Sequence, residues 1–578
     1  MRYYCLTCDY DGTLARDGQV ARSTLEALKR VSASGRKLVL ATGRELNDLL
    51  RVFPEVGFFD RVVAENGAVL YAPSTREQRI LADPPPDDFT EELRRRAVQP
   101  LSVGQCIVAT WHPFESVVLE VIRSSGLELQ VIFNKNAVMI LPSGVNKGTG
   151  LRVALDELGL SPHNVVGIGD AENDHAFLGI CECSVAVGNA LPALKERTDL
   201  VTTGTHGAGV EEAIDQLLAD DMLSIAPRLK RHQILLGRTS DGEGFLLDPY
   251  GTRILVVGPS GGGKSTIVSA IVERLIENQY QVCLIDPEGD YDDFETLVTL
   301  GGTNRIPASS EILEVLRTAG TSMSINLLGV PLADRPSYFL SLLPRLQELR
   351  ARTGRPHWII VDEAHHLMPA GLDSASLSVP QDLGSFVLIT VHPAHVAPPI
   401  LNSMNGVIAI GPRPETLIEQ LNTAAGTDLI LPQLPGPEIR SGQMLVWIFS
   451  ESSQPCTVVL ETGKAELRRH KRKYATGELG EDKSFYFRGP EGKLKLRAQN
   501  LNLFTQLAEG VDDETWIHHL RNKDYSTWLR ESVKDDVIAD EIAIIEQDHD
   551  LGPAASRAHV IEAIRRHYTG PALIAPAL

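Results

Sequence analysis

A glycine-rich run near the middle of this 578-residue chain has the composition of a phosphate-binding loop. The run reads Gly258-Pro259-Ser260-Gly261-Gly262-Gly263-Lys264-Ser265-Thr266, after an apolar stretch at 254–257 and before a helical pattern at 267–276. A strand, a glycine loop and a helix in that order let backbone N–H groups and the helix N-terminus surround phosphate oxygens. We therefore expect the whole run to bind ATP. Lys264 should contact the β- and γ-phosphates, and the Ser265 hydroxyl should hold Mg²⁺.

Two acids end a later apolar stretch at 358–361, where Asp362 and Glu363 are adjacent. A buried strand that ends in two acids is the expected partner of a phosphate-binding loop. Asp362 is expected to hold Mg²⁺ through water, and Glu363 to polarise the water that attacks the γ-phosphate. The alternative is that these acids cap the helix that follows.

A second pair of acids lies near the N-terminus, where the apolar segment 3–8 runs into Asp9-Tyr10-Asp11-Gly12. Alternate side chains of an extended segment point the same way, so Asp9 and Asp11 should face one site. Asp9 can attack phosphorus as a nucleophile, and Asp11 can protonate the leaving oxygen and later activate water. Because negative charge is crowded there, we expect Asp9 and Asp11 to bind Mg²⁺, which prefers oxygen ligands.

Further polar residues follow other strand-like segments, and open α/β sheets place their ligands at the carboxyl ends of strands. Thr42 follows the segment 37–41, and Asp170 follows the segment 165–169, with Asp174 shortly after it. Lys147 lies in the glycine-containing stretch 142–150. Thr42 and Lys147 are predicted to bind the phosphoryl group, and Asp170 and Asp174 to bind Mg²⁺.

These four motifs, in this order, resemble the haloacid dehalogenase (HAD) superfamily of phosphatases, in the branch of the Cof-type and sucrose-phosphatase-like enzymes. Glu65-Asn66-Gly67-Ala68 and the segment 185–190 match the same branch, and the resemblance covers residues 1–219. It implies a Rossmann-like core, an aspartyl-phosphate intermediate, Mg²⁺ and a small phosphorylated substrate of the phosphoglycolate or sugar phosphate class. It also implies a small α+β cap at about 83–141. Within the cap we expect helices at 90–97 and 114–123 and strands at 127–133 and 137–141.

The second region, about 234–461, is similar to the HerA/FtsK-like ATPases. The resemblance rests on Asp286-Pro-Glu-Gly-Asp-Tyr291 and on Asp362-Glu-Ala-His365. It implies a RecA-like fold and ring assemblies, usually hexamers, so we expect a homo-oligomer. A short hairpin is expected at 234–247.

Two residues of this region are assigned with alternatives left open. His392 stands where the resemblance places a glutamine that senses the γ-phosphate, and the alternative is a histidine with a structural role. Arg413 is the candidate for the arginine that reaches the nucleotide of a neighbouring subunit, and Arg440 is the second choice, with plain surface exposure as the alternative for each.

A length of 578 residues is too great for one core and predicts several domains, and the two resemblances imply that the first two are α/β. We expect a HAD phosphatase at 1–225, a P-loop ATPase at 226–462 and a mainly helical domain at 463–578. The net charge of −20 disfavours a broad nucleic-acid-binding surface, although the basic run 468–473 could be a local contact instead of a solvated linker. No apolar run reaches membrane-spanning length and no secretion signal is evident, so the cytoplasm is the expected compartment.

The leading hypothesis is therefore a Mg²⁺-dependent phosphatase of a small metabolite fused to a ring-type ATPase. The alternative is a DNA translocase in repair or antiviral defence, whose phosphatase processes nucleic-acid ends. A third hypothesis is that ATP only switches the assembly state.

Overall fold

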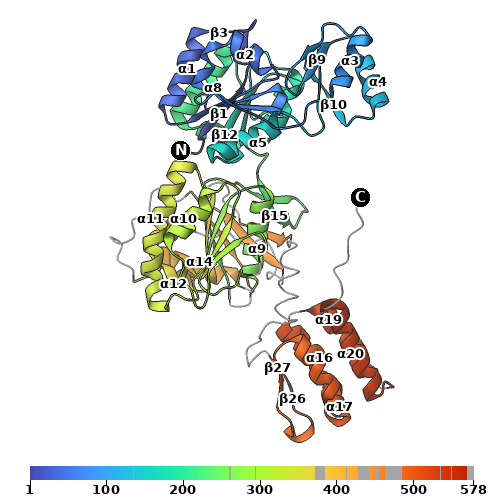
Figure 1. Ribbon diagram of the computed structural model, residues 1–578. Coiled ribbons are helices and arrows are strands. Elements are labelled where there is room, and N and C mark those ends of the chain that lie inside the picture. The colour runs from blue at the N-terminus through green and yellow to red at the C-terminus, as the bar shows by residue number, and fades with distance from the viewer. Residues whose placement is uncertain are drawn as a thin grey trace. The chain divides into compact units, whose positions relative to one another are not determined.

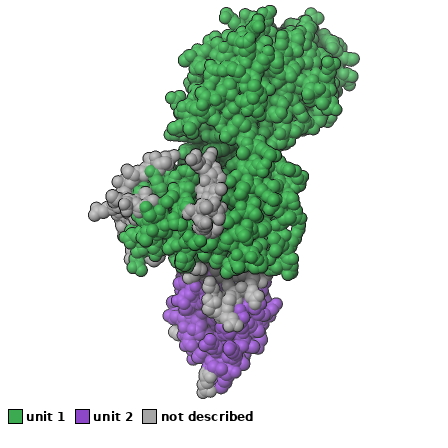
Figure 2. All heavy atoms as spheres, turned by 90° about the vertical axis from the view of Figure 1, so that its left-hand side faces the viewer, with its two compact units in different colours: residues 1–265, 274–461 green, residues 266–273, 462–578 purple. Residues whose placement is uncertain are grey.

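The computed structural model describes residues 1–568 except 135, 260–261, 293, 372–383, 412, 427–441, 450–454, 462–483, 534 and 549. The chain divides into two compact units, Met1–Ser265 with Arg274–Glu461, and Thr266–Glu273 with Thr462–Leu578, which Figure 2 colours separately. Within the described part of the chain, every helix is too short or too polar to cross a membrane.

The first unit begins with an eight-stranded sheet, called here the N-terminal sheet, in the order β14-β13-β12-β1-β4-β5-β6-β7. Its parallel strands are β1 (Cys5–Asp9), β4 (Lys37–Ala41), β5 (Arg61–Ala64), β12 (Val165–Gly169), β13 (Cys183–Ala186) and β14 (Leu200–Val201). The antiparallel edge is formed by β6 (Val69–Ala72) and β7 (Glu77–Ile80). The central strand β1 is buried along its whole length, as parallel strands covered on both faces are.

Helices cover both faces of the N-terminal sheet (Figure 1). Here α1 (Arg22–Ala33) packs on α8 (Gly207–Asp220), and α5 (Lys147–Leu158) packs on α6 (His175–Ile180). Shorter elements are β2 (Ala15–Arg16), β3 (Gln19–Val20), α2 (Leu46–Val52) and α7 (Pro192–Lys195). A parallel sheet between two helical layers is the Rossmann-like core that the sequence predicts.

The cap is a small α+β insertion with its own apolar core. Its sheet has the order β10-β11-β9-β8. The strands are β8 (Ser102–Val103), β9 (Val108–Trp111), β10 (Leu129–Asn134) and β11 (Ala137–Pro142), and the helices are α3 (Asp87–Arg95) and α4 (Glu115–Ser125). Both expected helices and both expected strands are present, with ends displaced by at most three residues.

The first unit also contains an eleven-stranded sheet, called here the central sheet, in the order β16-β15-β25-β24-β23-β17-β22-β21-β18-β20-β19. The hairpin predicted at 234–247 is formed by β15 (Ile234–Thr239) and β16 (Gly244–Leu247). The remaining strands are β17 (Arg253–Val257), β18 (Val282–Asp286), β19 (Val298–Gly301), β20 (Met323–Asn326), β21 (Trp358–Val361), β22 (Ser385–Thr390), β23 (Gly406–Ala409), β24 (Gln443–Ile448) and β25 (Cys456–Leu460).

The strand β17, which precedes the glycine-rich run, lies inside the central sheet and pairs in parallel with β22 and β23. The helices of this region are α9 (Lys264–Glu277), α10 (Ser309–Arg317), α11 (Arg335–Thr353), α12 (Ala364–Leu367), α13 (Pro398–Asn402) and α14 (Pro414–Ala425). The order β17-β22-β21 places the strand before His392 between the glycine-rich run and the strand before Asp362.

The C-terminal part is mainly helical, with one two-stranded sheet formed by β26 (Phe485–Phe487) and β27 (Leu496–Ala498). Its helices are α16 (Leu501–Gly510), α17 (Asp513–Arg521), α18 (Asp524–Trp528), α19 (Asp536–Gln547) and α20 (Pro553–Tyr568). Trp516 and Trp528 are buried in an aromatic cluster, so they are core residues. The basic run 468–473 lies outside the described residues.

Candidate active sites

Three carboxylates meet at the carboxyl ends of the neighbouring strands β1 and β12. Asp9 ends β1, Asp170 follows β12, and Asp174 lies in the turn after it. One oxygen of each side chain lies within 4.8 Å of the others, and all three residues are buried. At Gly12, which has φ of 88°, a Cβ atom would approach an Asp170 oxygen to 2.4 Å, so the turn requires glycine.

Lys147 connects two of these carboxylates. It is the first residue of α5, it is 1% exposed, and its Nζ donates to Asp9 Oδ1 at 2.5 Å and to Asp174 Oδ1 at 2.6 Å. The position is set locally, because Asn146 caps α5 by accepting from the backbone N–H of Thr149. One buried ammonium therefore faces a group of buried acids at the N-terminus of a helix.

The electrostatics of the group suit a divalent cation. Burial, followed by the charge of Asp174, raises the pKa of Asp9 well above its usual value, although Lys147 lowers it. Burial lowers the pKa of Lys147, but Asp174 and Asp9 raise it further, so it ends above its ordinary value. Three buried carboxylates exceed the charge of one lysine, and their hard oxygen donors are the ligand type that Mg²⁺ prefers.

Asp11 lies outside this group of carboxylates. Arg44 donates to both of its oxygens, from Nε to Oδ2 at 2.7 Å and from Nη2 to Oδ1 at 2.7 Å. Arg44 also donates to Asp48 at 2.6 Å. The Asp11 side chain remains 39% exposed, which suits proton transfer with a bound substrate better than burial as a metal ligand. No role was predicted for Arg44, whose only sequence signal is its position just after the strand end at Thr42.

The cap is tied to the core by residues that sequence reasoning left without a role. The carboxylate of Glu65 accepts from the backbone N–H groups of Gln105, Cys106 and Ile107, which lead into β9. Asn66 donates to Met139 Sδ of the cap strand β11 at 2.7 Å. Glu65 and Asn66 both have positive φ, a conformation that a non-glycine residue seldom adopts. These contacts hold the cap segment close to the strand ends.

Two further residues complete this edge of the sheet. Asn173 donates to the side-chain oxygen of Asn66 at 2.9 Å, so the loop that carries Asp170 is joined to the loop at the cap. Thr42 is fully buried, and its hydroxyl accepts from the backbone N–H of Arg44 at 3.1 Å. The predicted residues Asp9, Thr42, Asp170 and Asp174 thus lie at adjacent strand ends, and Lys147 reaches Asp9 and Asp174 from the start of α5.

The glycine-rich run has the expected local geometry where it is described. α9 begins at Lys264, after Gly263 with φ of 97°, and Lys264 Nζ donates to the Pro259 carbonyl at 3.0 Å. Ser260 and Gly261 lie outside the described residues. The predicted ligands Gly258, Gly262, Ser265 and Thr266 flank the same turn in sequence and stay predictions.

Acids approach Lys264 from two other loops. Burial lowers the pKa of Lys264, while the charges of Glu363, Asp362, Glu288 and Asp290 raise it. Burial raises the pKa of Asp362 to about 6 and is also the main cause of a raised pKa at Glu363. The acids at the end of β21 therefore lie within electrostatic reach of the lysine, as the sequence predicts for a nucleotide site.

The loop after β18 is shaped by Asp286. Its Oδ1 accepts from the backbone N–H groups of Glu288 and Asp290, and its Oδ2 accepts from that of Tyr291 at 2.9 Å. Asp286 is fully buried, and burial raises its pKa to about 7. Asp286 thus folds the segment that brings Glu288 and Asp290 near Lys264.

His392 and Arg413 are exposed, and both follow strands that neighbour β17 in the central sheet. The ring of His392 lies 5.9 Å from that of His365, whose Nδ1 is 3.1 Å from Thr390 Oγ1. These positions are compatible with contact to a nucleotide or to a neighbouring subunit, and both assignments stay predictions.

Comparisons with known proteins match segments of both the phosphatase and the ATPase regions. Residues 6–96 and 125–214 match the family model of haloacid dehalogenase-like hydrolases, and residues 247–335 match that of the central domain of helicase HerA. The phosphoglycolate phosphatase of Methanothermobacter thermautotrophicus is 29% identical over 221 residues, 37% of this chain and 98% of that protein. The phosphoglycolate phosphatase of Halorubrum lacusprofundi is 30% identical over 223 residues, 37% of this chain and 96% of that protein.

A solved haloacid dehalogenase-like hydrolase from Bacteroides thetaiotaomicron is 21% identical, with a TM-score of 0.33, and the match covers 37% of this chain and 99% of that one. The sequence relative from Halorubrum lacusprofundi decides the family, because it is 30% identical and is matched over nearly its full length. The family model covers the segments that carry Asp9, Lys147 and Asp170. The chain therefore belongs to the haloacid dehalogenase-like hydrolases and carries a HerA-type ATPase segment in the same polypeptide.

Proposed function

We propose that the N-terminal region, residues 1–225 with a cap at about 83–141, hydrolyses the phosphate ester of a small metabolite. The observation that carries the proposal is the buried contact of Lys147 with Asp9 and Asp174 beside Asp170. A nucleophilic carboxylate, a fixed ammonium and a group of oxygen donors are the parts that phosphoryl transfer to an aspartate needs.

In the proposed reaction, Asp9 attacks phosphorus, so a bond forms between its carboxylate oxygen and phosphorus while the bond to the leaving oxygen breaks. Asp11 donates its proton to that oxygen and then accepts a proton from the water that cleaves the aspartyl-phosphate. Arg44 holds Asp11 in place through two hydrogen bonds. Mg²⁺, held by Asp9, Asp170 and Asp174, would neutralise charge on the phosphoryl group.

The substrate class follows from the cap and from the relatives. Glu65 and Asn66 hold the cap close to the strand ends, and a cap in that position would favour a small substrate. Phosphoglycolate is the first compound to test, because two relatives that this chain matches along most of their length are phosphoglycolate phosphatases. A sugar phosphate is the second.

We also propose that residues 226–462 form a RecA-like ATPase and residues 463–578 a separate helical domain. Lys264 and the loop from Gly258 to Thr266 would bind the phosphates of ATP, Asp362 and Ser265 would hold Mg²⁺, and Glu363 would polarise water. His392 would sense the γ-phosphate, and Arg413 would reach the nucleotide of a neighbouring copy in a homo-oligomeric ring. The match to the HerA central domain and the acids near Lys264 support this assignment.

One pair of variants tests both assignments in the full chain. Asp9→Asn should abolish phosphate release from phosphoglycolate and from p-nitrophenyl phosphate while ATP hydrolysis continues. Lys264→Ala should abolish ATP hydrolysis while phosphate ester hydrolysis continues. Phosphatase activity that survives in Asp9→Asn would refute the nucleophile.

The HerA match also favours a second candidate function, a translocase that moves DNA and trims its phosphate ends. Strong stimulation of ATP hydrolysis by DNA, together with release of phosphate from oligonucleotide ends, would favour this function over the metabolite phosphatase. A flat response across several nucleic acids would remove it.

A further inference from the structure

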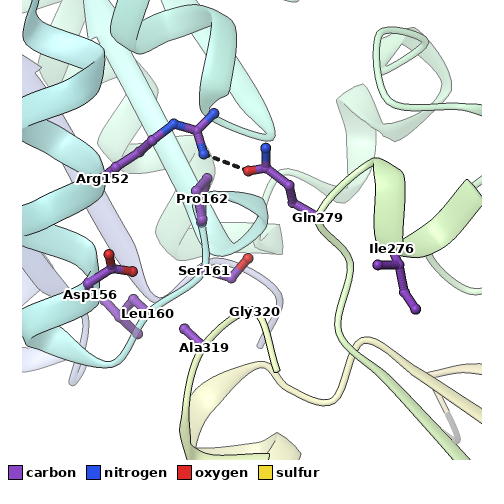
Figure 3. A pocket seen from close by; sticks show the side chains of 9 residues that line it. All are labelled: Arg152, Asp156, Leu160, Ser161, Pro162, Ile276, Gln279, Ala319 and Gly320. Atoms are coloured by element: carbon purple, nitrogen blue, oxygen red, sulfur yellow. Dashed lines mark hydrogen bonds between the residues drawn. The ribbon is translucent and has the colours of Figure 1, made fainter. Parts of the chain in front are cut away.

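The two lysines of the proposed sites each begin a helix, and a hydrogen bond joins the first helix to the chain just beyond the end of the second. Lys147 begins α5 and Lys264 begins α9. Arg152, five residues along α5, donates to the side-chain oxygen of Gln279, two residues beyond the end of α9, at 2.5 Å. Figure 3 shows this bond directly, with Arg152 on the phosphatase side and Gln279 on the ATPase side.

The bond spans a cavity of about 270 Å³. Asp156 and Ser161 line it on the phosphatase side, and Ile276 and Gly320 line it on the ATPase side (Figure 3). Arg152 and Gln279 therefore form an exposed polar contact beside this space.

A buried contact beside the cavity joins the same two segments. His163 Nε2 lies 2.7 Å from the carbonyl oxygen of Asn278, the C-cap residue of α9, and His163 Nδ1 lies 2.7 Å from a carboxylate oxygen of Glu182. The carbonyl oxygen can only accept, so Nε2 donates to it. Tyr280 stacks on the His163 ring at 3.7 Å between centroids and donates to Glu182 at 3.0 Å.

The charge balance of this contact favours its formation. Burial raises the pKa of Glu182, but the hydrogen bond and charge of His163, with the charge of Arg2, lower it to about 2. Arg2 donates to the other Glu182 oxygen at 2.6 Å. The buried carboxylate is thus fully paired, and removing one partner would leave an uncompensated buried charge.

The far end of α5 is held as well. Arg355, which is 1% exposed, donates from Nη2 to the carbonyl of Gly159 at 2.6 Å, and Gly159 is the C-terminal cap of α5. The ATPase side therefore contacts α5 near its middle, at its end and in the loop that follows. A rotation or translation of α9 must either break these contacts or move α5.

We infer that occupancy of the ATP site and occupancy of the phosphatase site are energetically coupled through the contact between α5 and the end of α9. This inference rests on the proposed function of both sites. Phosphate groups bound at Lys264 would contact the first turn of α9. The helix extends about 21 Å, at 1.5 Å per residue, from Lys264 to Asn278. From Arg152 back to Lys147 is about 8 Å along α5. Because these contacts join the end of α9 to α5, a displacement of one helix can be passed to the other.

Coupling of this kind is reciprocal. If ATP changes the affinity of the phosphatase site by some factor, a ligand at Asp9 must change ATP affinity by the same factor, and such factors are typically about 5 to 150. Through this coupling, ATP binding would change the rate of phosphate ester hydrolysis, and binding of the phosphorylated substrate would change the affinity for ATP.

The test compares the full chain with three variants. Phosphatase activity is measured on p-nitrophenyl phosphate with and without a saturating non-hydrolysable ATP analogue and Mg²⁺. The dissociation constant of the analogue is measured in parallel by fluorescence. Arg152→Ala and Gln279→Ala each remove the bond across the cavity without touching either site. Arg79→Ala is the matched control, because Arg79 binds Glu157 on the same helix at 2.9 Å, outside the junction.

We expect the analogue to change kcat/KM of the wild-type phosphatase by about 5-fold or more. Arg152→Ala and Gln279→Ala should each bring the ratio of kcat/KM with and without the analogue closer to one. The double variant should have the same ratio as either single variant, because all three remove the same bond. Arg79→Ala should keep the wild-type ratio. A ratio of one in wild-type protein that hydrolyses the ester and binds the analogue would overturn the coupling alone. An equal ratio in all variants would overturn its route through Arg152. Absence of ester hydrolysis or of analogue binding in the wild type would instead overturn the proposed function.

Discussion

The Arg44 guanidinium donates two hydrogen bonds of 2.7 Å to the Asp11 carboxylate, one to each oxygen. A planar fork bound to both oxygens fixes the carboxylate in orientation as well as position. Asp11, the proposed acid for the leaving oxygen, is therefore held by Arg44, which follows the neighbouring strand β4. Arg44 is held in turn by its hydrogen bond to Asp48.

Replacing Arg44 by alanine should slow phosphatase turnover by about 10- to 100-fold, part of the ~10²- to 10⁴-fold that positioned acid catalysis supplies. The loss should be larger for an alkyl phosphate than for p-nitrophenyl phosphate, whose leaving group needs little protonation. Steady-state kinetics on both esters measure this difference. Arg51→Ala, which removes another contact to Asp48, should leave both rates near wild type. Equal losses on the two esters would contradict the positioning role.

The cap should loosen when Glu65 is replaced by glutamine. The amide of glutamine can accept at one atom only, so at least one of the three backbone N–H groups at 105–107 loses its partner, at a cost of about 1–3 kcal/mol. Faster hydrogen exchange at those amides and a higher KM are the expected results. Glu77→Gln, on the exposed strand β7, is the control. Unchanged exchange at 105–107 would show that other contacts hold the cap.

The metal-free protein should lose stability as the pH rises. The pKa of Asp9 is raised well above its usual value, and those of Asp286 and Asp362 are raised to about 7 and about 6. A carboxyl group whose pKa is raised by folding stabilises the fold fully below its unfolded pKa of about 4. That contribution is lost as the pH rises through the folded value.

Unfolding midpoints in EDTA should therefore fall between about pH 5 and pH 8, and Mg²⁺ with an ATP analogue should reverse much of the fall. Asp9→Asn should reduce the slope, because its side chain carries no charge at any pH. A midpoint that rises through this range would contradict the burial of these acids.

Lys264→Ala should raise the dissociation constant of an ATP analogue and lower ATP hydrolysis by about 10²-fold or more, because it removes a preorganised charge from the phosphates. Lys230→Ala, outside the glycine-rich run, serves as control. Isothermal titration and phosphate release give the two values. Wild-type affinity in Lys264→Ala would place the nucleotide elsewhere.

Short motifs carried most of the local information. The spacing of Asp9 and Asp11 after an apolar strand, and of the glycines before Lys264, is governed by chain geometry over a few residues, so strands, loops and helix starts were predictable. The hairpin at 234–247 followed from its apolar runs and the turn between them, whereas the cap was implied by the family resemblance. The helices and strands expected within the cap end up to three residues from their predicted positions, because local patterns do not define where a helix or strand stops.

The partnerships of side chains were not predictable in the same way. Asp11 was assigned to the metal with Asp9 because both face one side of a strand, yet Arg44 from the neighbouring strand end binds Asp11, while Asp174 and Lys147 join Asp9. Glu65 had no assigned role because its three partners lie some forty residues away in the chain.

By itself, the sequence indicated a phosphatase and an ATPase through its resemblance to two families, and with the first a Rossmann-like core. It also supplied candidate residues for each site, because strand ends and glycine turns are local properties. Only the tertiary structure decided that Arg152 and His163 meet the end of α9, and that Arg355 binds the end of α5. These contacts join residues more than a hundred positions apart. Such pairs are selected by the packing of whole helices and sheets, which leaves no periodic trace in the chain.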